Sequence, residues 1–177
     1  MRIIAGRWAG RPLVSPSGRV RPTSESLRDA CMGLLRGELQ DARVLDLFAG
    51  TGALGLEAMS RGAARCDFVE NGPAALHALK ANVAALRVRN RTRIFDRDAI
   101  PFVGSIPDIR YDIAFADPPY GSRKLDRIVA RWLDVPFSRW LAVEHAPDHA
   151  LGVRGRTRRV GDSVVTLLGP AREGDRS

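Results

Sequence analysis

Apolar residues in the central part of the chain fall into two alternating patterns. Short apolar runs bounded by polar residues, glycine or proline predict buried strands. Longer stretches in which apolar residues recur at every third or fourth position predict amphipathic helices. The runs predict strands at residues 44–48, 66–70, 92–95, 111–116 and 140–144, and the spacing predicts helices that begin near Pro22-Thr23-Ser24, at Leu54 and at Pro73, with another through residues 128–132.

Strands that alternate with helices predict an α/β fold with a mostly parallel sheet and helices on both faces. Residues 158–168 differ, because two β-prone pieces flank Gly161-Asp162, and they predict a closing antiparallel hairpin. A length of 177 residues suits one domain.

The two ends of the chain do not follow the central pattern. Residues 1–22 alternate short β-prone pieces with Gly and Pro, and they contain five Arg and no acidic residue. We expect a basic N-terminal β arm over residues 1–22 that stands outside the core, a main domain over residues 23–170 and a disordered tail over residues 171–177.

The charge of the chain favours a polyanionic partner. The net charge is +8, with 26 Arg and only two Lys, a skew that codon composition could also produce. Two further Arg groups lie outside the arm. A solvated basic face is the alternative for each group, and for the second we prefer it. These groups are Arg87, Arg89, Arg91 and Arg93, and Arg154, Arg156, Arg158 and Arg159.

Other classes of protein are not favoured. No apolar run approaches the roughly 20 residues that cross a bilayer, and the first residues lack the apolar segment of a signal peptide. Cys31 and Cys66 are isolated and read as buried thiols, so we expect no metal site. We expect a cytoplasmic monomer that does not bind membranes.

The most informative motif is Asp117-Pro118-Pro119-Tyr120, directly after the predicted strand 111–116. Loops at the carboxyl ends of strands are the usual place for chemistry in α/β folds. Two prolines stiffen the loop. A carboxylate, carbonyls and an aromatic ring can together hold a planar base and accept hydrogen bonds from its amino group. The alternative is a proline-stiffened turn with no chemistry.

A second motif, Asp46 to Gly55, joins the first strand of the α/β unit to its helix. Gly50 and Gly52 let the backbone turn tightly and approach a ligand at a helix N-terminus. The spacing Gly50-x-Gly52-x-x-Gly55, with Glu70 further on, also satisfies the NAD pattern. Against NAD, the Asp46 charge would repel a pyrophosphate, no hydride-transfer site follows, and the loop of Asp117 has no place in that chemistry.

S-adenosylmethionine fits these residues better. Asp46, Phe48 and the two glycines would form the cradle beside its cationic amino-acid group, and Glu70 would bind its ribose diol. Asp98 and the backbone of Ala99 would read its adenine. Two alternatives stay open: Glu70 could be a plain surface acid, and Asp98 could be a helix cap.

With these motifs in order, the chain resembles the class I methyltransferases that modify exocyclic amines. The start of the chain, Arg2-Ile3-Ile4-Ala5-Gly6 followed by Arg21-Pro22-Thr23 and Arg28, is similar to the RsmD-type 16S ribosomal RNA guanine-N2 methyltransferases. Val143-Glu144 strengthens the resemblance, which covers residues 2–168. Residues 146–157 fit no pattern of the family.

The resemblance implies a Rossmann-like class I methyltransferase fold, with a twisted sheet, the C-terminal hairpin and the short N-terminal β arm. It also implies S-adenosylmethionine as the methyl donor and ribosomal RNA, alone or within the small subunit, as the partner. Asp117 and Pro118 would hold the guanine amine, Tyr120 would stack on the base, and Asp117 could also accept its proton. Residues that would bind RNA are Arg11, Arg21, Thr23 and Arg28.

Other functions are not excluded at this point. The Pro-Pro motif is shared by adenine, cytosine and guanine amine methylases, so an adenine methyltransferase acting on DNA or RNA stays open. A sequence-specific DNA methylase usually has an added target-reading domain, for which 177 residues leave no room. An RNA-binding module without activity would explain the basic arm but not the acids at three strand ends, and an NAD-binding oxidoreductase is the remaining alternative.

Overall fold

The computed structural model describes residues 1–15, 24–119 and 121–170 of the chain. Tyr120, Arg21 and Thr23, which the sequence analysis assigned to the site, lie outside the described residues, as does the predicted tail. Within the described part, no helix is both long and apolar enough to cross a membrane.

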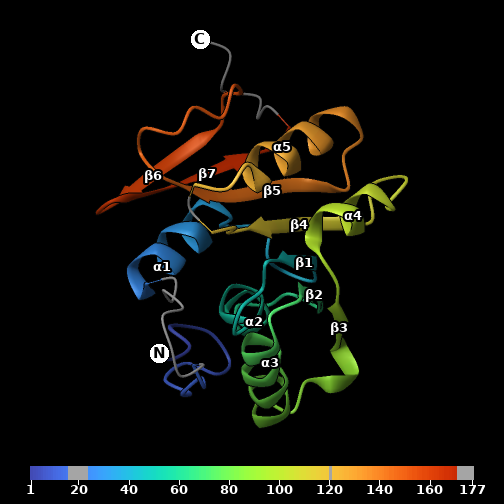
Figure 1. Cartoon of the computed structure of the whole chain (residues 1–177). Coiled ribbons are helices and arrows are strands. Elements are labelled where there is room, and N and C mark those ends of the chain that lie inside the picture. The colour runs from blue at the N-terminus through green and yellow to red at the C-terminus, as the bar shows by residue number, and fades with distance from the viewer. Residues whose placement is uncertain (16–23, 120, 171–177) are drawn as a thin grey trace.

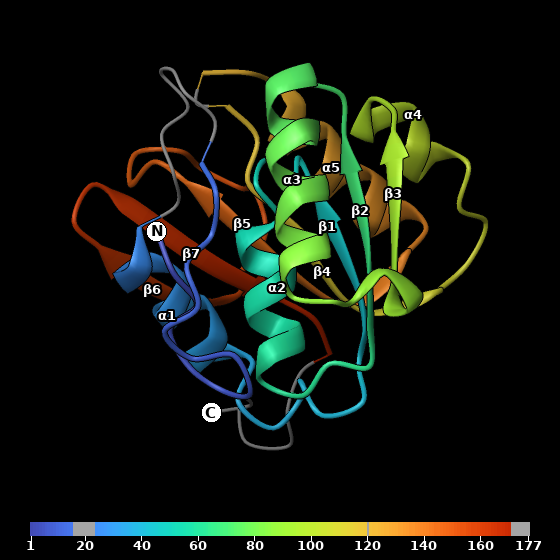
Figure 2. The same cartoon turned by 90° about the horizontal axis from the view of Figure 1, so that it is seen from below.

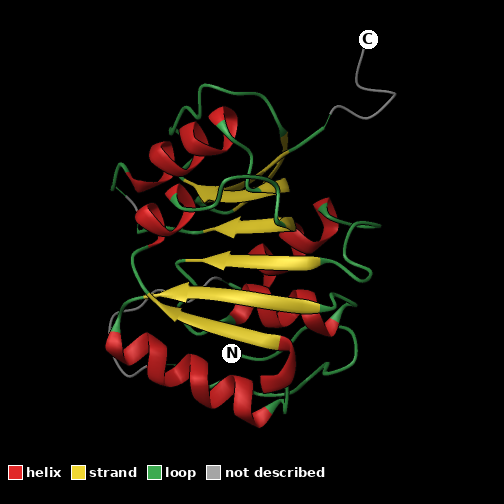
Figure 3. Ribbon diagram, turned by 90° about the vertical axis from the view of Figure 1, so that its right-hand side faces the viewer, coloured by secondary structure: helices red, strands yellow, loops and turns green. Residues whose placement is uncertain are grey.

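A seven-stranded sheet forms the centre of the fold, with the strand order β3-β2-β1-β4-β5-β7-β6 (Figure 1). Strands β3, β2, β1, β4 and β5 are parallel, and their arrowheads point to one edge (Figure 3). Strand β7 is antiparallel to both β5 and β6. The bounds are β1 Arg43–Leu47, β2 Arg65–Glu70, β3 Thr92–Asp96, β4 Tyr111–Ala116, β5 Ser138–His145, β6 Arg156–Val160 and β7 Ser163–Leu168.

Helices cover both faces of the sheet. Helices α1, α2 and α3 pack on one face, where they appear in front of the strands in Figure 2. Helices α4 and α5 pack on the other face. The bounds are α1 Glu25–Leu34, α2 Ala53–Ser60, α3 Pro73–Ala85, α4 Ala99–Gly104 and α5 Lys124–Asp134, with a short 3-10 turn η1 at Arg89–Arg91. The predicted fold class is therefore confirmed.

Successive strand residues alternate between the two helical layers, as the pleat of a strand requires. Phe115 of β4 packs with α1, α2 and α3, whereas Ala116 packs with α4 and α5. Residue 117 follows on the Phe115 side, so the end of β4 directs Asp117 toward the layer of α1 and α2.

The predicted strands agree with the observed ones to within two residues at each end. One boundary differs for a clear reason: Phe48 has a φ of 57°, in the left-handed region, and this ends β1 at Leu47. Helix α4 was not predicted, because six residues are too few to display a helical period.

The N-terminal hairpin, defined here as residues 1–13, is part of the core. Its Arg2–Pro12 bridge confirms the predicted hairpin. The expectation that it stands outside the core is wrong, because Ile3 is 0% exposed and Leu13 is 6% exposed. Gly6 has a φ of 84°, and a Cβ there would lie 2.0 Å from the Ser60 carbonyl oxygen, so the hairpin lies directly against α2.

Candidate active site at the carboxyl ends of the parallel strands

Acidic residues lie at the carboxyl ends of the parallel strands, and those of β4 and β5 are neighbours. Leu47 of β1 pairs with Ala116 of β4, and Ala116 pairs with Val143 of β5. The next residues along β4 and β5 are Asp117 and Glu144, so these two acids lie at neighbouring strand ends. In parallel sheets this edge is the place where ligands bind.

The glycine loop after β1 turns sharply before α2. Gly50 and Gly52 have φ values of 56° and 78°, which favour glycine. A Cβ at Gly52 would lie 2.4 Å from Leu79 Cδ1, and one at Gly55 would lie 2.5 Å from Cys66 Sγ. The glycines therefore let α2 pack closely on the sheet and let the backbone of the loop line the site.

Asp46 is a buried acid beneath this loop. It is 2% exposed, and its Oδ2 accepts a hydrogen bond of 2.9 Å from the Gly55 N–H. Burial raises the pKa of Asp46 to about 8, and the charges of Asp117 and Glu70 act in the same direction. A cationic ligand group would favour the ionised form of Asp46, so this acid suits a ligand that carries an ammonium.

Glu70 binds the glycine loop to the end of β2. Its Oε2 accepts a hydrogen bond of 2.8 Å from Gly50 N–H, and its Oε1 accepts bonds of 2.9 and 2.7 Å from Asn71 and Gly72 N–H. The alternative of a plain surface acid is wrong, because the carboxylate organises the loop. A carboxylate has about four acceptor positions, so Glu70 can also accept a hydroxyl group of a ligand.

Asp98 caps α4, as the helix-cap alternative supposed. Its Oδ1 accepts a hydrogen bond of 2.9 Å from Ile100 N–H, and this bond, helped by Lys124, lowers the pKa of Asp98. Ala99, the first residue of α4, is buried. The adenine contact of Asp98 and Ala99 stays a proposal.

Lys124 is a site residue that sequence reasoning missed. Its Nζ lies 3.4 Å from Asp98 Oδ2 and 5.6 Å from the centre of the Phe48 ring. It therefore connects the loop after β1 with the end of β3. One signal was available, since the chain uses Lys only twice and places this one soon after the Pro-Pro motif.

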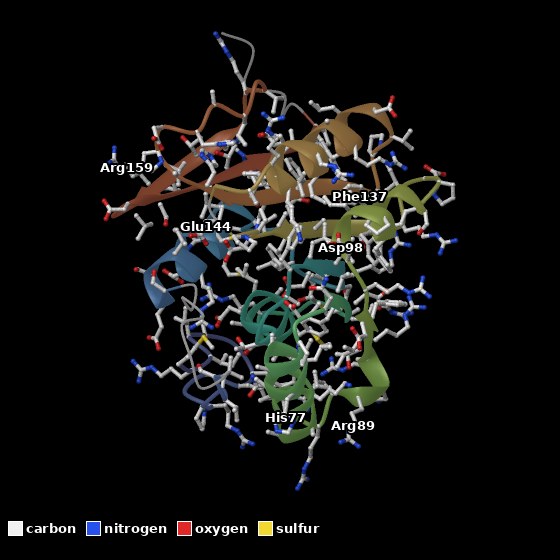
Figure 4. The ribbon with its side chains drawn as sticks, viewed as in Figure 1. His77, Arg89, Asp98, Phe137, Glu144 and Arg159 are labelled. Atoms are coloured by element: carbon white, nitrogen blue, oxygen red, sulfur yellow. The ribbon has the colours of Figure 1, made fainter. Side chains whose placement is uncertain are left out.

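A pocket lies beneath Asp117 on the α1 and α2 side of the sheet. Cys31 of α1 and Leu54 of α2 line it together with Asp117 and Glu144. Glu144 also lines a second hollow, with Pro118, Pro119 and the side chains that follow β5. Figure 4 shows Glu144 above α1, at the opposite end of β5 from Phe137.

Glu144 is the second residue whose place in the site was missed. It belonged only to the motif that carried the resemblance, and no spacing in the sequence indicates that β5 ends beside β4. Its Oε1 accepts a hydrogen bond of 3.0 Å from Ser163 Oγ of β7, which orients the carboxylate. Pro118 is buried and Asp117 is half-buried, so the rigid loop is partly enclosed.

Arg11 and Arg28, the predicted RNA-binding residues that the structure describes, do not lie at this edge. Arg28 is 0% exposed, its guanidinium donates to the Arg2 carbonyl oxygen at 2.8 Å, and burial lowers its pKa. A phosphate cannot reach it, so that prediction is wrong. Arg11 is exposed but donates to the Ala85 carbonyl oxygen at 3.2 Å, where α3 ends, and Figure 2 shows this end of α3 at the edge away from the strand tips.

The remaining candidates have ordinary structural roles. Cys31 and Cys66 are free and buried. His145 Nε2 lies 2.8 Å from Thr166 Oγ1, and His149 Nε2 lies 2.8 Å from Asp126 Oδ1. Within residues 1–15, 24–119 and 121–170, no three His, Cys, Asp or Glu side chains are grouped so that they could hold a metal ion.

Comparison with known proteins agrees with this geometry. The chain is 37% identical to the ribosomal RNA small subunit methyltransferase D of Escherichia coli K12 over 145 residues, which cover 81% of this chain and 71% of the relative. It is 32% identical to the protein of the same name from Haemophilus influenzae, over 68% of this chain and 64% of the relative.

Solved structures share nearly the whole fold. A hypothetical protein from Thermus thermophilus superposes with a TM-score of 0.84 at 30% identity, over 96% of this chain and 99% of that one. An Escherichia coli protein assigned as a methyltransferase superposes with a TM-score of 0.82 at 31% identity, over 94% and 96%. Residues 1–147 match the family described as "Conserved hypothetical protein 95". The chain therefore belongs to this family, that of the RsmD-type ribosomal RNA small subunit methyltransferases.

Proposed function

We propose that this protein transfers a methyl group from S-adenosylmethionine to the exocyclic N2 amine of one guanine in the 16S RNA of the small ribosomal subunit. Family membership supports the reaction class and the RNA substrate. The observation that carries the proposal is that Asp117 and Glu144 lie at the carboxyl ends of neighbouring strands, at the same edge of the sheet as the glycine loop.

The residues after β1, β2 and β3 fit the methyl donor. S-adenosylmethionine supplies an electrophilic methyl group on a sulfonium. Asp46, buried and with a raised pKa, would face its ammonium. Glu70, fixed by three backbone N–H groups, would use its remaining acceptor position for a hydroxyl of the ribose diol. Asp98 and Ala99, with Phe48 and Lys124 beside them, would enclose the adenine.

Asp117 and Pro118 would prepare the acceptor amine. The N2 lone pair of guanine is delocalised into the ring, so the amine is a weak nucleophile. Hydrogen bonds from its N–H groups to the Asp117 carboxylate and the Pro118 carbonyl localise that lone pair and direct it at the methyl carbon. The N2 nitrogen would bond to the methyl carbon as the C–S bond of the donor breaks, and the Asp117 carboxylate would accept the proton that the nitrogen releases. Most of the acceleration comes from positioning and preorganised dipoles.

The pair of carboxylates favours guanine over adenine. The pairing edge of guanine presents two adjacent kinds of donor, the N1–H and the N2 amino group. The pairing edge of adenine presents its amino group next to N1, which is an acceptor and would be repelled by a second carboxylate. Asp117 and Glu144 at neighbouring strand ends offer acceptors for both donors of guanine. Tyr120 would stack on the base once it leaves its own stack.

The test is methyl transfer to RNA that lacks the modification. Free 16S RNA and small subunits from cells without this protein are incubated with tritiated S-adenosylmethionine, and the RNA is digested to nucleosides. We expect the label in N2-methylguanosine. Label in N6-methyladenosine would contradict the guanine assignment, and saturable binding of NAD in place of S-adenosylmethionine would contradict the reaction.

A further inference from the structure

Strand β6 is the most basic surface strand of the described structure. Three of its five residues, Arg156, Arg158 and Arg159, are arginines, and Arg154 precedes them. No acidic residue occurs between Asp148 and Asp162. Arg154, Arg158 and Arg159 are exposed. None of the four forms an ion pair with a residue that the structure describes.

The strand pairing places the end of β6 at the edge that holds the site. Glu144 of β5 pairs with Val165 of β7, and Val165 pairs with Arg158 of β6. Arg158 is therefore in the same row as Glu144, two strand spacings of about 4.8 Å away. Directly paired residues point to the same face, so Arg158 is on the face of the sheet toward which Glu144 points. His145 pairs with Val164, which pairs with Arg159, so Arg159 is on the other face.

The picture of the side chains agrees with this placement. Glu144 and Arg159 appear on the same side of the molecule in Figure 4, with Arg159 further out along β6. Arg89, from another Arg group of the sequence, appears at the lower end of the view, away from Glu144. Of the two Arg groups outside residues 1–22, the β6 group is the one that continues the edge that holds Glu144.

Not every arginine of β6 is available to a ligand. Arg156 lies 5.4 Å from the ring centre of Trp140, and it is only partly exposed. Its packing on Trp140 explains its presence, so we leave it out of the inference. Arg159 Nε donates to the Gly161 carbonyl oxygen at 3.2 Å, but its side chain stays exposed. Arg154 and Arg158 are exposed as well.

Edge strands often carry charges that prevent pairing with another sheet. Acidic and basic residues would serve that role equally well. The role also does not require the charges to lie at the end of the strand nearest the active site. The contrast with the N-terminal hairpin is informative. Arg2 of the hairpin pairs with Glu25, and Arg11 of the hairpin donates to the end of α3 at the opposite edge.

We propose that β6 is a phosphate-binding strand, on which Arg158 and Arg159, with Arg154, hold the RNA backbone beside the target nucleotide. The proposal rests on the proposed function, because it takes RNA as the substrate. The family match covers residues 1–147, so β6 lies outside the matched residues. An enzyme that draws one base out of its stack must bind the flanking phosphates. The arginines of this strand would supply those phosphate contacts where the base would enter.

The test compares two double variants of the full chain. Arg158→Gln/Arg159→Gln removes the two exposed arginines at the end of β6 that lies in the same rows as Glu144 and His145. Arg65→Gln/Arg110→Gln removes two exposed cations, at the start of β2 and just before β4, which lie at the opposite edge of the sheet. Binding of a 16S RNA transcript is measured by fluorescence anisotropy at several salt concentrations, and binding of S-adenosylmethionine is measured by calorimetry.

We expect the β6 variant to lose RNA affinity and to show a flatter salt dependence. Each lost phosphate contact removes about 0.7–0.9 from the slope of log K against log salt concentration. The control variant should keep the slope of the unchanged protein, and both variants should bind S-adenosylmethionine normally. An unchanged slope in the β6 variant, or an equal loss in the control, overturns the proposal.

Two further readouts separate the possible failures. If the β6 variant self-associates in light scattering while it binds RNA normally, the arginines protect the sheet edge and the proposal is wrong. If the unchanged protein binds RNA through β6 but labels no nucleoside, the proposed function fails and the binding strand stands. If the unchanged protein labels guanosine but the β6 variant keeps the same salt-dependence slope of RNA binding, the proposed function stands and the phosphate-binding proposal for β6 is wrong.

Discussion

The two halves of the sheet edge hold their acidic side chains differently. In the half formed by β1, β2 and β3, backbone N–H groups fix the carboxylates, as Gly55 does for Asp46 and Gly50 for Glu70. In the half formed by β4 and β5, Asp117 and Glu144 line a pocket, and a side-chain hydroxyl of Ser163 orients Glu144.

This difference separates holding a ligand from acting on one. Backbone donors are fixed by the fold, so the acids of the first half keep one geometry and suit a ligand that always has the same shape. Asp117 and Glu144 lie at neighbouring strand ends in the other half of the edge, and Asp117 begins the rigid Pro-Pro loop, so the second half suits the acceptor base. We therefore expect substitutions in the first half to change cofactor affinity and substitutions in the second half to change the rate.

The largest expected effect comes from a buried acid of α2 that binds the N-terminal hairpin. Glu57 is 0% exposed and accepts hydrogen bonds from Ile4 N–H, Ala5 N–H and Arg61 Nε. Glu57→Ala leaves these donors and the buried Arg28 without their anion. We expect the free energy of unfolding to fall by about 3–5 kcal/mol, measured by urea denaturation.

A matched control is the exposed pair of Arg2 and Glu25. Glu25→Ala should cost less than about 1 kcal/mol. A similar small cost for Glu57→Ala would mean that the N-terminal hairpin is the separable arm that the sequence suggested.

Asp117→Asn should have the next largest effect, on the rate. The change keeps the shape of the side chain but places an amide where the acceptor amine needs a carboxylate. We expect methyl transfer to 16S RNA to fall by about 10²–10³-fold, the size of effect seen when one preorganised polar group is removed. Affinity for S-adenosylmethionine in calorimetry should stay within twofold, and a parallel loss of both would show that the motif is only structural.

Glu70→Ala should act on affinity. The substitution leaves the N–H groups of Gly50 and Gly72 unpaired and removes the acceptor for a ribose hydroxyl. We expect S-adenosylmethionine binding to weaken by about 1–3 kcal/mol in calorimetry. An Asp96→Ala variant, with its exposed side chain at the end of neighbouring β3, is the control and should bind normally.

The raised pKa of Asp46 gives a smaller, pH-dependent effect. A carboxyl whose pKa is about 8 in the folded protein and 3.8 as a free group is protonated below pH 8, so a cationic ligand must displace that proton. Affinity for S-adenosylmethionine should rise by up to about tenfold per pH unit between pH 6 and 8. Asp46→Asn should weaken binding and remove this rise, as seen in calorimetry across that range.

The same shift predicts an opposite effect on stability. Because the folded state binds this proton more tightly than the unfolded state, ionisation of Asp46 costs stability as the pH rises from about 4 toward 8. Asp46→Asn should therefore raise the melting temperature of the ligand-free protein at pH 8. A lower melting temperature at pH 8 would contradict the assigned shift.

The sequence predicted most of the fold, because its strands and longer helices repeat a clear apolar pattern. It could not predict α4, which is too short to show a period, and it misjudged the N-terminal hairpin. Ile3 and Leu13 lie among Gly, Pro and Arg, so local composition hid their burial. Their partners lie far along the chain, as Glu57 does for Ile4.

The candidate site was predicted where one motif carries several groups, as at Asp46 to Gly55 and at Asp117-Pro118. It was missed where the order of the strands brings distant residues together. Nothing in the local sequence indicates that Glu144 lies beside Asp117 or that Lys124 reaches Asp98. Arg28 shows the converse error. Its charge indicated a surface contact, but only the fold shows that it is buried beside Glu57.

The central claim is that one half of the edge holds the methyl donor and the other holds the acceptor. Single-turnover methylation of 16S RNA by Glu70→Ala and Asp117→Asn, each titrated to saturation with S-adenosylmethionine, tests it most directly. We predict that Glu70→Ala regains a rate within about threefold of the unchanged protein at saturation. Asp117→Asn should stay about 10²–10³-fold slower at every concentration. Equal deficits at saturation in the two variants would contradict the division.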